Sequence, residues 1–374
     1  MKIGITCYPT YGGSGAVATE LGIALAHRGH EIHFITYRQP FRLPAFLPRV
    51  FFHEVDVGRY PLFEYPPYDL ALSVRMHEVV LAHRLDLLHC HYAIPHATSA
   101  WIAKEMLEPT RPDIKVLTTL HGTDITIVGQ DPSFHAITKF SIEKSDRLTA
   151  VSRFLQQETI SAFGDTGSRI EVIPNFVDPA VYDRARYPGS RGAFGDGRPV
   201  LMHISNFRPV KRVADIVRVF ARVTAELPSL LVMVGDGPDR IVAEREAARL
   251  GVQDQVMFLG KIESVAPLLA SADLYLLPTD RESFGLSALE ALASGTPVIG
   301  ARAGGLPEVV EDGVTGALCE VGDVEAMAAA AMRILGDRDL WHKMSRAAAS
   351  DARARYSLDD VVSRYERLYA DALR

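Results

Sequence analysis

The chain has few cysteines, and they stand too far apart to act together. Only Cys7, Cys90 and Cys319 occur among its 374 residues. An odd number of cysteines at such spacing excludes a disulfide framework and a CxxC metal cluster. We therefore expect a protein of the reducing cytoplasm.

Long apolar runs are also missing. No uninterrupted stretch approaches the ~20 residues that a membrane helix needs, and the apolar run in MKIGITCYPT is too short for a secretory signal core. We expect neither a membrane span nor stable membrane association. The segment RQPFRLPAFLPR could instead form a basic, apolar membrane patch. Its prolines argue against an amphipathic helix, so we favour a loop over an acceptor site.

Neither sign of charge dominates the sequence. Forty lysines and arginines oppose 46 acidic residues, which leaves a net charge of -6. A nucleic-acid-binding domain is expected to carry a basic stripe, so nucleic acid is an unlikely partner on this count. The hydrophobic share of 48% is that of a globular protein. The length exceeds what one core comfortably holds and favours two or three domains.

Strands and helices alternate through the first half. MKIGITCYP predicts a buried strand, YGGSGAVATELGIALAHRGH a glycine turn and a helix that stops at Gly29, and EIHFITY a second strand. This βαβ unit implies a parallel sheet covered by helices. Further strands are expected at VFFHEVDV, LDLLHCHY, KVLTTLHG, DRLTAVS and IEVIPN.

The same pattern restarts after a Gly-, Pro- and Arg-rich connector, DRARYPGSRGAFGDGRP. PVLMHISN, LLVMVGDGP, QVMFLG and LYLLPT predict strands, and VKRVADIVRVFARVTAEL predicts an amphipathic helix. We expect an α/β protein of two doubly wound, Rossmann-like domains, 1–176 and 177–355, that face each other across a cleft. Residues 356–374 predict a C-terminal helix that could pack back on the first domain.

The first glycine turn is compatible with more than one ligand. Gly13, Gly15 and Ala18 match G-x-G-x-x-A, which suggests a nicotinamide dinucleotide. That fingerprint also needs an acidic residue at the end of the second strand, where this chain has Thr36-Tyr37-Arg38. A dehydrogenase is therefore disfavoured. The turn can still bring backbone N–H groups to an anion, or it can be a plain tight turn.

Histidines cluster in the first half. HCHYAIPH places His89 and His91 on one face of a strand, with His96 nearby, and an H-x-H pair can bind a metal. No carboxylate or third ligand stands at a recognised spacing, so we predict buried histidines and no metal site.

The segment TTLHGTD places Thr119, His121 and Asp124 at the carboxyl end of the next strand. Open α/β sheets present their chemistry at that end. The alternative is a hydrogen-bonded turn in which Asp124 caps a helix.

The second half contributes cations and a pair of acids. SNFRPVKR places Arg208 and Lys211 just after a strand, where they can neutralise a diphosphate. RESFGLSALE sets Glu282 and Glu290 eight positions apart around a Ser-Phe-Gly turn. The helix that opens there would aim free N–H groups at a phosphate, and each glutamate could accept hydrogen bonds from neighbouring sugar hydroxyls. The alternative is a surface helix with two solvated acids.

Together with GTPVIGARAGGLPEVVEDGVTG, these motifs resemble those of the retaining family 4 glycosyltransferases, which have the glycosyltransferase B fold. The resemblance covers essentially the whole chain. CYPTYGGSG, PFRLP, FEYPPYDLAL, HCHYAIPHA and TTLHGTDIT narrow it to members that begin bacillithiol biosynthesis. It implies that N-acetylglucosamine moves from UDP-N-acetylglucosamine to the hydroxyl of L-malate, with retention and without a metal or other cofactor. Both partners would be small molecules, and a homo-oligomer stays open.

The resemblance also implies residue roles. Glu290 would hold the UDP ribose, Glu282 the transferred sugar, Arg208 and Lys211 the diphosphate, and His121 would lie beside the anomeric carbon. With Glu290, the other donor-site residues are Gly13, Asn206, Gly235, Ser283, Phe284, Gly285 and Leu286. Malate is a small dianion, and our candidates for its site are Ser14, Tyr92, Thr119 and Arg153.

One departure affects the diphosphate site. Many relatives carry Gly-Arg where this chain has Ser205-Asn206. Either Arg208 replaces that arginine, or Asn206 faces the acceptor.

The leaving diphosphate could be neutralised by cations and helix N-termini instead of Mg²⁺, and could itself take the acceptor proton. The rival functions are the same donor with an inositol phosphate or lipid acceptor, a UDP-sugar epimerase, and a non-catalytic nucleotide-binding protein.

Overall fold

The computed structural model describes residues 1–374 except 11, 59–63, 165–169, 190–191, 193 and 195–196. The chain divides into two compact units. Unit 1 comprises Met1–Pro174 and Asp359–Arg374, and unit 2 comprises Asn175–Leu358. The sequence-based divisions were placed after residues 176 and 355.

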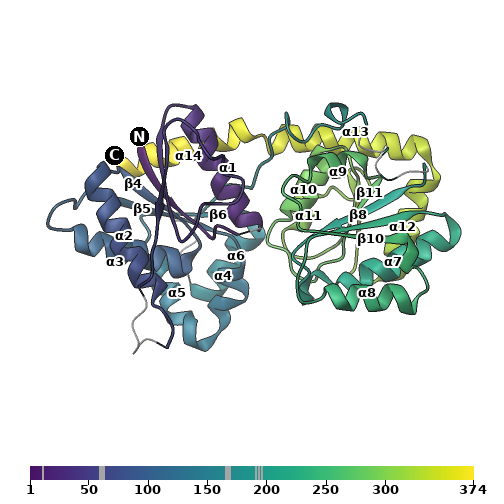
Figure 1. The fold of residues 1–374 in the computed structure, drawn as a ribbon, viewed down its shortest axis with the longest axis horizontal. Helices are drawn as coiled ribbons and strands as arrows, with labels where there is room; N and C mark the ends of the chain where they lie inside the picture. The colour runs from purple at the N-terminus through teal and green to yellow at the C-terminus, as the bar shows by residue number, and fades with distance from the viewer. Residues whose placement is uncertain (11, 59–63, 165–169, 190–191, 193, 195–196) are drawn as a thin grey trace. The chain divides into compact units, whose positions relative to one another are not determined.

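Unit 1 contains a seven-stranded sheet in the order β3-β2-β1-β4-β5-β6-β7, in which every pairing is parallel (Figure 1). Its strands are β1 Lys2–Thr6, β2 Glu31–Thr36, β3 Val50–Glu54, β4 Leu87–His91, β5 Lys115–Leu120, β6 Arg147–Ala150 and β7 Ile170–Val172. Its helices are α1 Gly13–His27, α2 Tyr68–His83, α3 Thr98–Leu107, α4 Thr123–Thr126, α5 Pro132–Lys144 and α6 Arg153–Phe163, with the short turns η1 Ala93–Ala97 and η2 Val128–Gln130.

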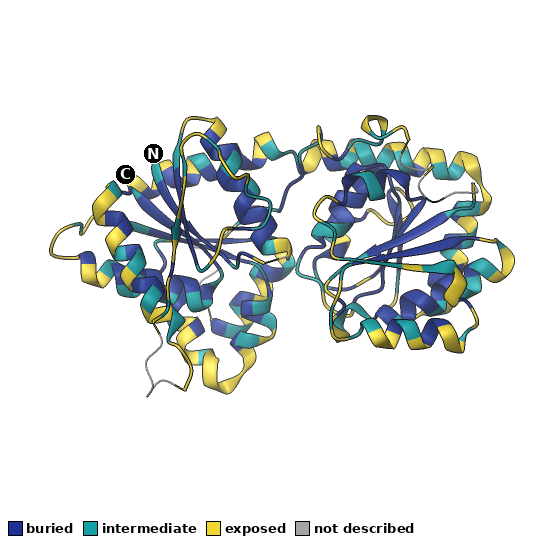
Figure 2. Cartoon of the chain, viewed as in Figure 1, coloured by how far each residue is buried: buried dark blue, intermediate teal, exposed yellow. Residues whose placement is uncertain are grey.

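Alternate residues along each strand point to opposite faces of this sheet. Leu88 and Cys90 of β4 join an apolar core with Met76 of α2 and Ala100 of α3. The central strands are buried, whereas the edge strand β3 is partly exposed and the helices keep exposed outer faces (Figure 2). This is the near-continuous apolar pattern that a sheet covered on both sides requires.

The C-terminal helix α14, Leu358–Leu373, packs with α1 on the other face of the unit 1 sheet (Figure 1). The Tyr369 hydroxyl lies 2.8 Å from His89 Nδ1, and the Tyr365 hydroxyl lies 3.3 Å from Thr119 Oγ1. Arg28 at the end of α1 pairs with Glu366. The helix therefore returns to unit 1 and reaches the histidine-bearing strand β4.

Unit 2 contains a six-stranded parallel sheet in the order β10-β9-β8-β11-β12-β13. Its strands are β8 Val200–Ile204, β9 Leu230–Val234, β10 Val256–Gly260, β11 Leu274–Leu277, β12 Val298–Ala301 and β13 Gly316–Cys319. Its helices are α7 Val213–Glu226, α8 Arg240–Arg249, α9 Ala266–Ser271, α10 Leu286–Ala293, α11 Leu306–Val309, α12 Val324–Gly336 and α13 Arg338–Arg355, with the 3₁₀ turns η4 Arg184–Arg186, η6 Pro209–Lys211 and η7 Gln253–Gln255.

Part of the expected connector is anchored in unit 2. Residues 190–191, 193 and 195–196 of that segment lie outside the described residues. Within η4, the Arg184 guanidinium donates to the carbonyls of Ala272 and Ser294 at 2.7 and 3.2 Å. Because these contacts hold the first part of the segment on the domain, the described portion is not a free linker.

Both sheets confirm the predicted doubly wound class. In each, the chain builds outward from a central strand, returns beside that strand, and then builds in the opposite direction. The reversal falls between β1 and β4 in unit 1 and between β8 and β11 in unit 2. Loops diverge at such a point, so ligands bind at the carboxyl ends of these strands. None of the described helices has the length and apolar character needed to cross a membrane.

Tyr369→Phe tests the anchoring of α14. The change removes the hydroxyl that lies against His89 Nδ1 and leaves that buried nitrogen without its partner, so the free energy of unfolding should fall by about 1–3 kcal/mol. Urea unfolding followed by circular dichroism measures it. Tyr65→Phe is the matched control, because Tyr65 is 80% exposed and its change should stay within about 0.5 kcal/mol. Equal stability of the two variants would contradict the anchoring.

Candidate active site

In unit 2, two loops meet at the switch point. Residues 205–212 follow β8, and residues 278–285 follow β11. The Thr279 hydroxyl and the Asp280 N–H both donate to the carbonyl of Val210, at 2.8 and 3.1 Å. The loops are thereby fixed to each other, and their charged side chains converge.

An ion pair joins these loops. Lys211 Nζ lies 2.7 Å from Glu282 Oε2, and the two side chains are 20% and 15% exposed. The sequence assigned these residues to separate parts of a donor, whereas the structure pairs them directly. A phosphate that reached Lys211 would replace one anionic partner by another, and Glu282 would then be released to accept hydrogen bonds from hydroxyls.

Glycines hold the Glu282 turn in place. A side chain at Gly304 would begin 2.0 Å from the Glu282 carbonyl oxygen, and the N–H of Gly305 donates to the same oxygen at 2.7 Å. Gly285 has φ +96°, a left-handed conformation that favours glycine. The glycines of AGGLPE therefore serve the turn by letting two backbones touch.

The helix α10 begins directly after this turn, at Leu286. Among the described residues, no side chain caps it, so its first backbone N–H groups can meet an anion. Ser283 lies within the same turn. The Phe284 ring is buried and packs edge-on against Tyr356, with centroids 5.6 Å apart. Phe284 thus anchors the turn, and only its backbone could serve a ligand.

Glu290 lies in α10 and is 5% exposed. Its Oε1 accepts a hydrogen bond from the Tyr182 hydroxyl at 2.6 Å. Sequence reasoning missed Tyr182, since a tyrosine 108 positions away carries no spacing signal. The phenol orients the carboxylate at a buried position, where an unpaired charge would be costly.

The remaining donor candidates are Arg208, Asn206 and Gly235. Arg208 and Asn206 are exposed, and the Arg208 guanidinium has no hydrogen-bond or ion-pair partner within the described part of the chain. Gly235 has φ +114°, and a side chain there would begin 1.8 Å from the Ser205 carbonyl oxygen. Gly235 is therefore required for the close packing of the loops after β8 and β9. The structure leaves Arg208 available to an anion.

In unit 1, the loops after β1 and β4 meet through aromatic rings. Tyr8 and Tyr92 pack edge-on with centroids 5.3 Å apart. Ser14, in the first turn of α1, lies close enough to the Tyr92 phenol to lower its pKa against the larger effect of burial. Gly13 begins that helix and is exposed, and no described side chain caps it. The structure therefore brings Gly13, Ser14 and Tyr92 together.

Tyr92 has an unusual backbone, with φ +99°. A bulky residue in that region is strained, and such strain clusters at functional positions. Its N–H donates to the carbonyl of Thr119 at 2.9 Å. Burial raises the pKa of the phenol to about 12, so the hydroxyl stays protonated at neutral pH and can donate a hydrogen bond.

Asp124 pins the neighbouring loops. Its Oδ1 accepts from the N–H of Gly122 at 2.9 Å, and its Oδ2 accepts from the N–H of Ala93 at 3.0 Å. Burial raises its pKa to about 6, against the effect of these hydrogen bonds. The carboxylate acts as a structural brace between the loops after β4 and β5. This agrees with the hydrogen-bonded turn of the plainer alternative, but Asp124 lies inside α4 and does not cap it.

His121 is a neutral group at physiological pH. Burial, followed by the nearby His89 and His96, lowers its pKa to about 3. Its Nε2 lies 2.9 Å from Nδ1 of His91, and the two rings stack. His121 therefore offers a neutral ring, and its backbone carbonyl is a second group suitable beside a sugar.

The histidines of the HCHYAIPH segment form contacts inside unit 1. Both nitrogens of His89 are engaged, Nδ1 with Tyr369 and Nε2 with Thr119 at 2.8 Å. His96 Nδ1 contacts the backbone carbonyl of His91 at 2.5 Å. Both nitrogens of His89 are thus occupied, whereas Nε2 of His91 and Nε2 of His96 are buried without a hydrogen-bond partner among the described residues.

The structure corrects one acceptor candidate, Thr119, and places another, Arg153, away from Tyr92. Thr119 is fully buried, and its hydroxyl lies within 2.8 Å of both His89 and Thr149. It has no exposed surface for malate, so the sequence-based assignment of Thr119 is wrong. Arg153 is exposed and begins α6, after β6, two strands along the sheet from β4. No described contact brings it to Tyr92.

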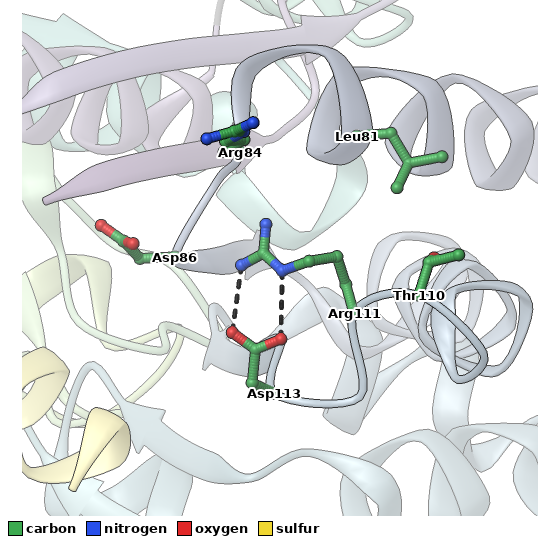
Figure 3. Close-up of a pocket in the computed structure, with 6 residues that line it drawn as sticks. All are labelled: Leu81, Arg84, Asp86, Thr110, Arg111 and Asp113. Atoms are coloured by element: carbon green, nitrogen blue, oxygen red, sulfur yellow. Dashed lines mark hydrogen bonds and ion pairs between the residues drawn. The ribbon is translucent and has the colours of Figure 1, made fainter.

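A surface hollow lies elsewhere in unit 1 (Figure 3). Its lining residues are Leu81, Arg84, Asp86, Thr110, Arg111 and Asp113. Arg111 pairs with Asp113 through two hydrogen bonds of 3.0 and 3.1 Å. The hollow stands at the amino ends of β4 and β5, opposite to the edge where open α/β sheets bind ligands. We therefore assign it no role in the active site.

Comparisons with known proteins agree with this geometry. The family described as Glycosyltransferase Family 4 matches residues 11–181, and that described as Glycosyl transferases group 1 matches residues 190–351. The chain is similar to the N-acetyl-alpha-D-glucosaminyl L-malate synthase of Bacillus anthracis, with 48% identity over all of this chain and 98% of that relative. It is 27% identical to the D-inositol 3-phosphate glycosyltransferase of Nocardia farcinica over 91% of this chain and 81% of that one.

Solved structures share the fold. The sucrose-phosphate synthase of Thermosynechococcus elongatus superimposes with a TM-score of 0.82 and 22% identity, over 99% of this chain and 98% of that structure. The Anabaena protein Alr3699/HepE in complex with UDP and glucose gives 0.83 at 20% identity, over 99% of both chains. With a relative 48% identical from end to end, this chain belongs to the N-acetyl-α-D-glucosaminyl L-malate synthase family of glycosyltransferases, which have the glycosyltransferase B fold.

Proposed function

We propose that this enzyme transfers N-acetylglucosamine from UDP-N-acetylglucosamine to the hydroxyl of L-malate, the first step of bacillithiol biosynthesis. The observation that carries the proposal is the 48% identity with the Bacillus anthracis synthase over the full chain. The geometry of the two switch points supplies a chemical role for each side chain.

The donor is assigned to unit 2. Its diphosphate meets Arg208, Lys211 and the uncapped start of α10, which together offer cations and backbone N–H groups. Glu290, oriented by Tyr182, accepts the ribose hydroxyls. Donor binding exchanges the Lys211–Glu282 ion pair for two new contacts, lysine to phosphate and glutamate to the sugar hydroxyls.

The acceptor is assigned to unit 1. The first turn of α1 contains no acidic residue and begins at Gly13 without a described side-chain cap, which suits a malate carboxylate. The protonated phenol of Tyr92 and the hydroxyl of Ser14 are neutral donors beside it. The two α/β units thus bind an anion in the same manner, at a helix start beside the switch point.

Transfer proceeds with retention and without a metal in this proposal. The leaving diphosphate is neutralised by Arg208, Lys211 and α10, and one of its oxygens takes the proton of the malate hydroxyl as the new glycosidic bond forms on the same face. His121 contributes as a neutral group beside the sugar, because burial lowers the pKa of its ring to about 3.

Acceptor identity is tested by a panel. The enzyme is incubated with UDP-N-acetylglucosamine and either L-malate, inositol phosphate or a lipid acceptor, and UDP release is measured. The inositol phosphate arm is included because of the 27% identical relative. Preference for L-malate is expected. An isomerised UDP-sugar without acceptor, or binding without turnover, would refute the transferase proposal.

The ribose assignment predicts that Glu290→Gln weakens UDP binding. Loss of hydrogen bonds to a charged carboxylate, worth about 1.5–3 kcal/mol each, should raise Kd by roughly 10- to 100-fold per bond. Titration calorimetry with UDP measures the change. Glu263→Gln is the control, since Glu263 is exposed and should leave Kd unchanged. Equal UDP affinity in wild type and Glu290→Gln would remove Glu290 from the ribose site.

The ion-pair exchange predicts a large effect of Lys211→Met. The change leaves developing phosphate charge uncompensated, so kcat should fall by about 10²–10³-fold. Lys343→Met, at an exposed lysine of α13, should have no effect. Because Lys211 and Glu282 act as one unit, adding Glu282→Gln should cost much less than the sum of the single effects. Full additivity in steady-state kinetics would show that the two residues act separately.

Metal independence predicts that turnover with UDP-N-acetylglucosamine and L-malate persists in excess EDTA. The reason is that Arg208, Lys211 and the start of α10 already neutralise the diphosphate. High salt should weaken donor binding only in part, since partly buried charges are less screened. Loss of activity in EDTA with rescue by Mg²⁺ or Mn²⁺ would show this neutralisation to be insufficient.

A further inference from the structure

A second group of histidines lies outside both switch points. His33 in β2, His53 in β3 and His83 at the end of α2 each turn one ring nitrogen toward the others, and these three atoms lie within 4.8 Å of one another. The ring centroid of His83 lies 4.5 Å from that of His33 and 4.9 Å from that of His53. Within the described part of the chain, this is the one group with spacing suited to a metal ion.

The inner member of the group is already oriented. His33 is fully buried, and its Nε2 lies 3.0 Å from Glu31 Oε1, which also pairs with Lys2 Nζ at 3.0 Å. A carboxylate accepts hydrogen bonds only, so His33 Nε2 carries the proton and Nδ1 presents a lone pair. Such carboxylate–histidine pairs are the usual outer partners of metal ligands, because they fix the tautomer and raise the basicity of the ligand.

The His33 lone pair points at His53. Its Nδ1 lies 2.9 Å from His53 Nε2, which is the distance of a hydrogen bond that His53 donates. Four ligands at 2.0–2.1 Å around a tetrahedral ion stand about 3.4 Å apart. The observed separations, from 2.9 Å to within 4.8 Å, bracket that value. Small ring rotations would therefore bring all three nitrogens to ligand distance.

The outer members of the group are accessible to an ion. His53 and His83 are half-buried, and neither nitrogen of His83 has a hydrogen-bond partner among the described residues. The group thus offers one ring with spare ligand atoms and one ring that Glu31 already orients.

We propose that His33, His53 and His83 form a three-histidine site for Zn²⁺, with Glu31 as the outer carboxylate and water as the fourth ligand. Zinc fits because it prefers tetrahedral imidazole donors. On binding, the proton of His53 moves from Nε2 to Nδ1, so that both lone pairs face the ion without net proton release. Oxygen-preferring Mg²⁺ and Ca²⁺ find no matching ligands in this set.

The ion would act as a structural cross-link. β3 is the edge strand of the unit 1 sheet and exposes Phe51 and Phe52, which are 43% and 37% exposed. Zinc would tie this edge to β2 and to the end of α2. The ligands come from elements other than the loops at the β1/β4 switch point, so removal of zinc should lower stability and leave the chemistry of transfer intact.

The test uses the full chain, freed of metal by chelation and dialysis. Titration with Zn²⁺ should give one site, and Co²⁺ should give the visible absorption of a tetrahedral ion. His53→Gln and His83→Gln should each lose the cobalt spectrum and bind zinc at least about tenfold more weakly, and Glu31→Gln should weaken binding by about 10- to 100-fold. His27→Gln is the matched control, because His27 is an exposed histidine of the same unit.

Two further measurements separate a metal site from a folding defect. Zinc should raise the thermal midpoint of the wild type and of His27→Gln, and should leave that of His53→Gln unchanged. UDP release should be equal in all folded variants. Wild-type protein that binds no Zn²⁺, or one-to-one binding that survives in His53→Gln and His83→Gln, would overturn the proposal and leave the cluster as a hydrogen-bonded stack of imidazoles.

Discussion

The arrangement of most candidate active-site residues depends on one constraint, the reversal of strand order in the middle of each parallel sheet. A parallel strand must be left by a crossover, and right-handed crossovers place successive helices on one face until the chain changes direction. At that change, the loops after β1 and β4, and those after β8 and β11, separate and leave their backbone groups accessible. The helices α1 and α10 both begin at such loops, and Lys211 and Glu282 meet at the second.

The second level of organisation is electrostatic. In unit 2 one acid and one cation of the candidate donor site neutralise each other, as the Lys211–Glu282 contact of 2.7 Å shows. Glu290 has an analogous stand-in, since the Tyr182 hydroxyl donates to its carboxylate as a ribose hydroxyl would. Keeping these groups paired avoids buried unpaired charge in the empty state. A ligand that binds here replaces existing contacts. Part of the free energy gained from its own contacts therefore offsets the loss of the contacts that it replaces.

The sequence predicted the architecture well, because alternating apolar strands and amphipathic helices carry their period in neighbouring residues. It also located Glu282, Glu290 and the glycine turn between them. It did not predict Tyr182 or the role of Gly304, since both depend on contacts between distant segments. Thr119 failed for a related reason. Being at the end of a strand places a residue near the site, but only the tertiary packing of Tyr365 and Tyr369 decides that its hydroxyl faces the interior.

The histidines show most clearly why residue type alone does not define a site. His89 and His91 have the compact H-x-H spacing of metal ligands, yet neighbouring polar groups engage both nitrogens of His89 and one nitrogen of His91. His33, His53 and His83 have no recognisable spacing, because a parallel sheet brings together residues separated by a whole crossover. What distinguishes the second group is a carboxylate behind one ring and three ring nitrogens that lie within 4.8 Å of one another. The capacity to bind a metal thus depends on which nitrogens the fold brings together, and the spacing of histidines in the sequence does not reveal it.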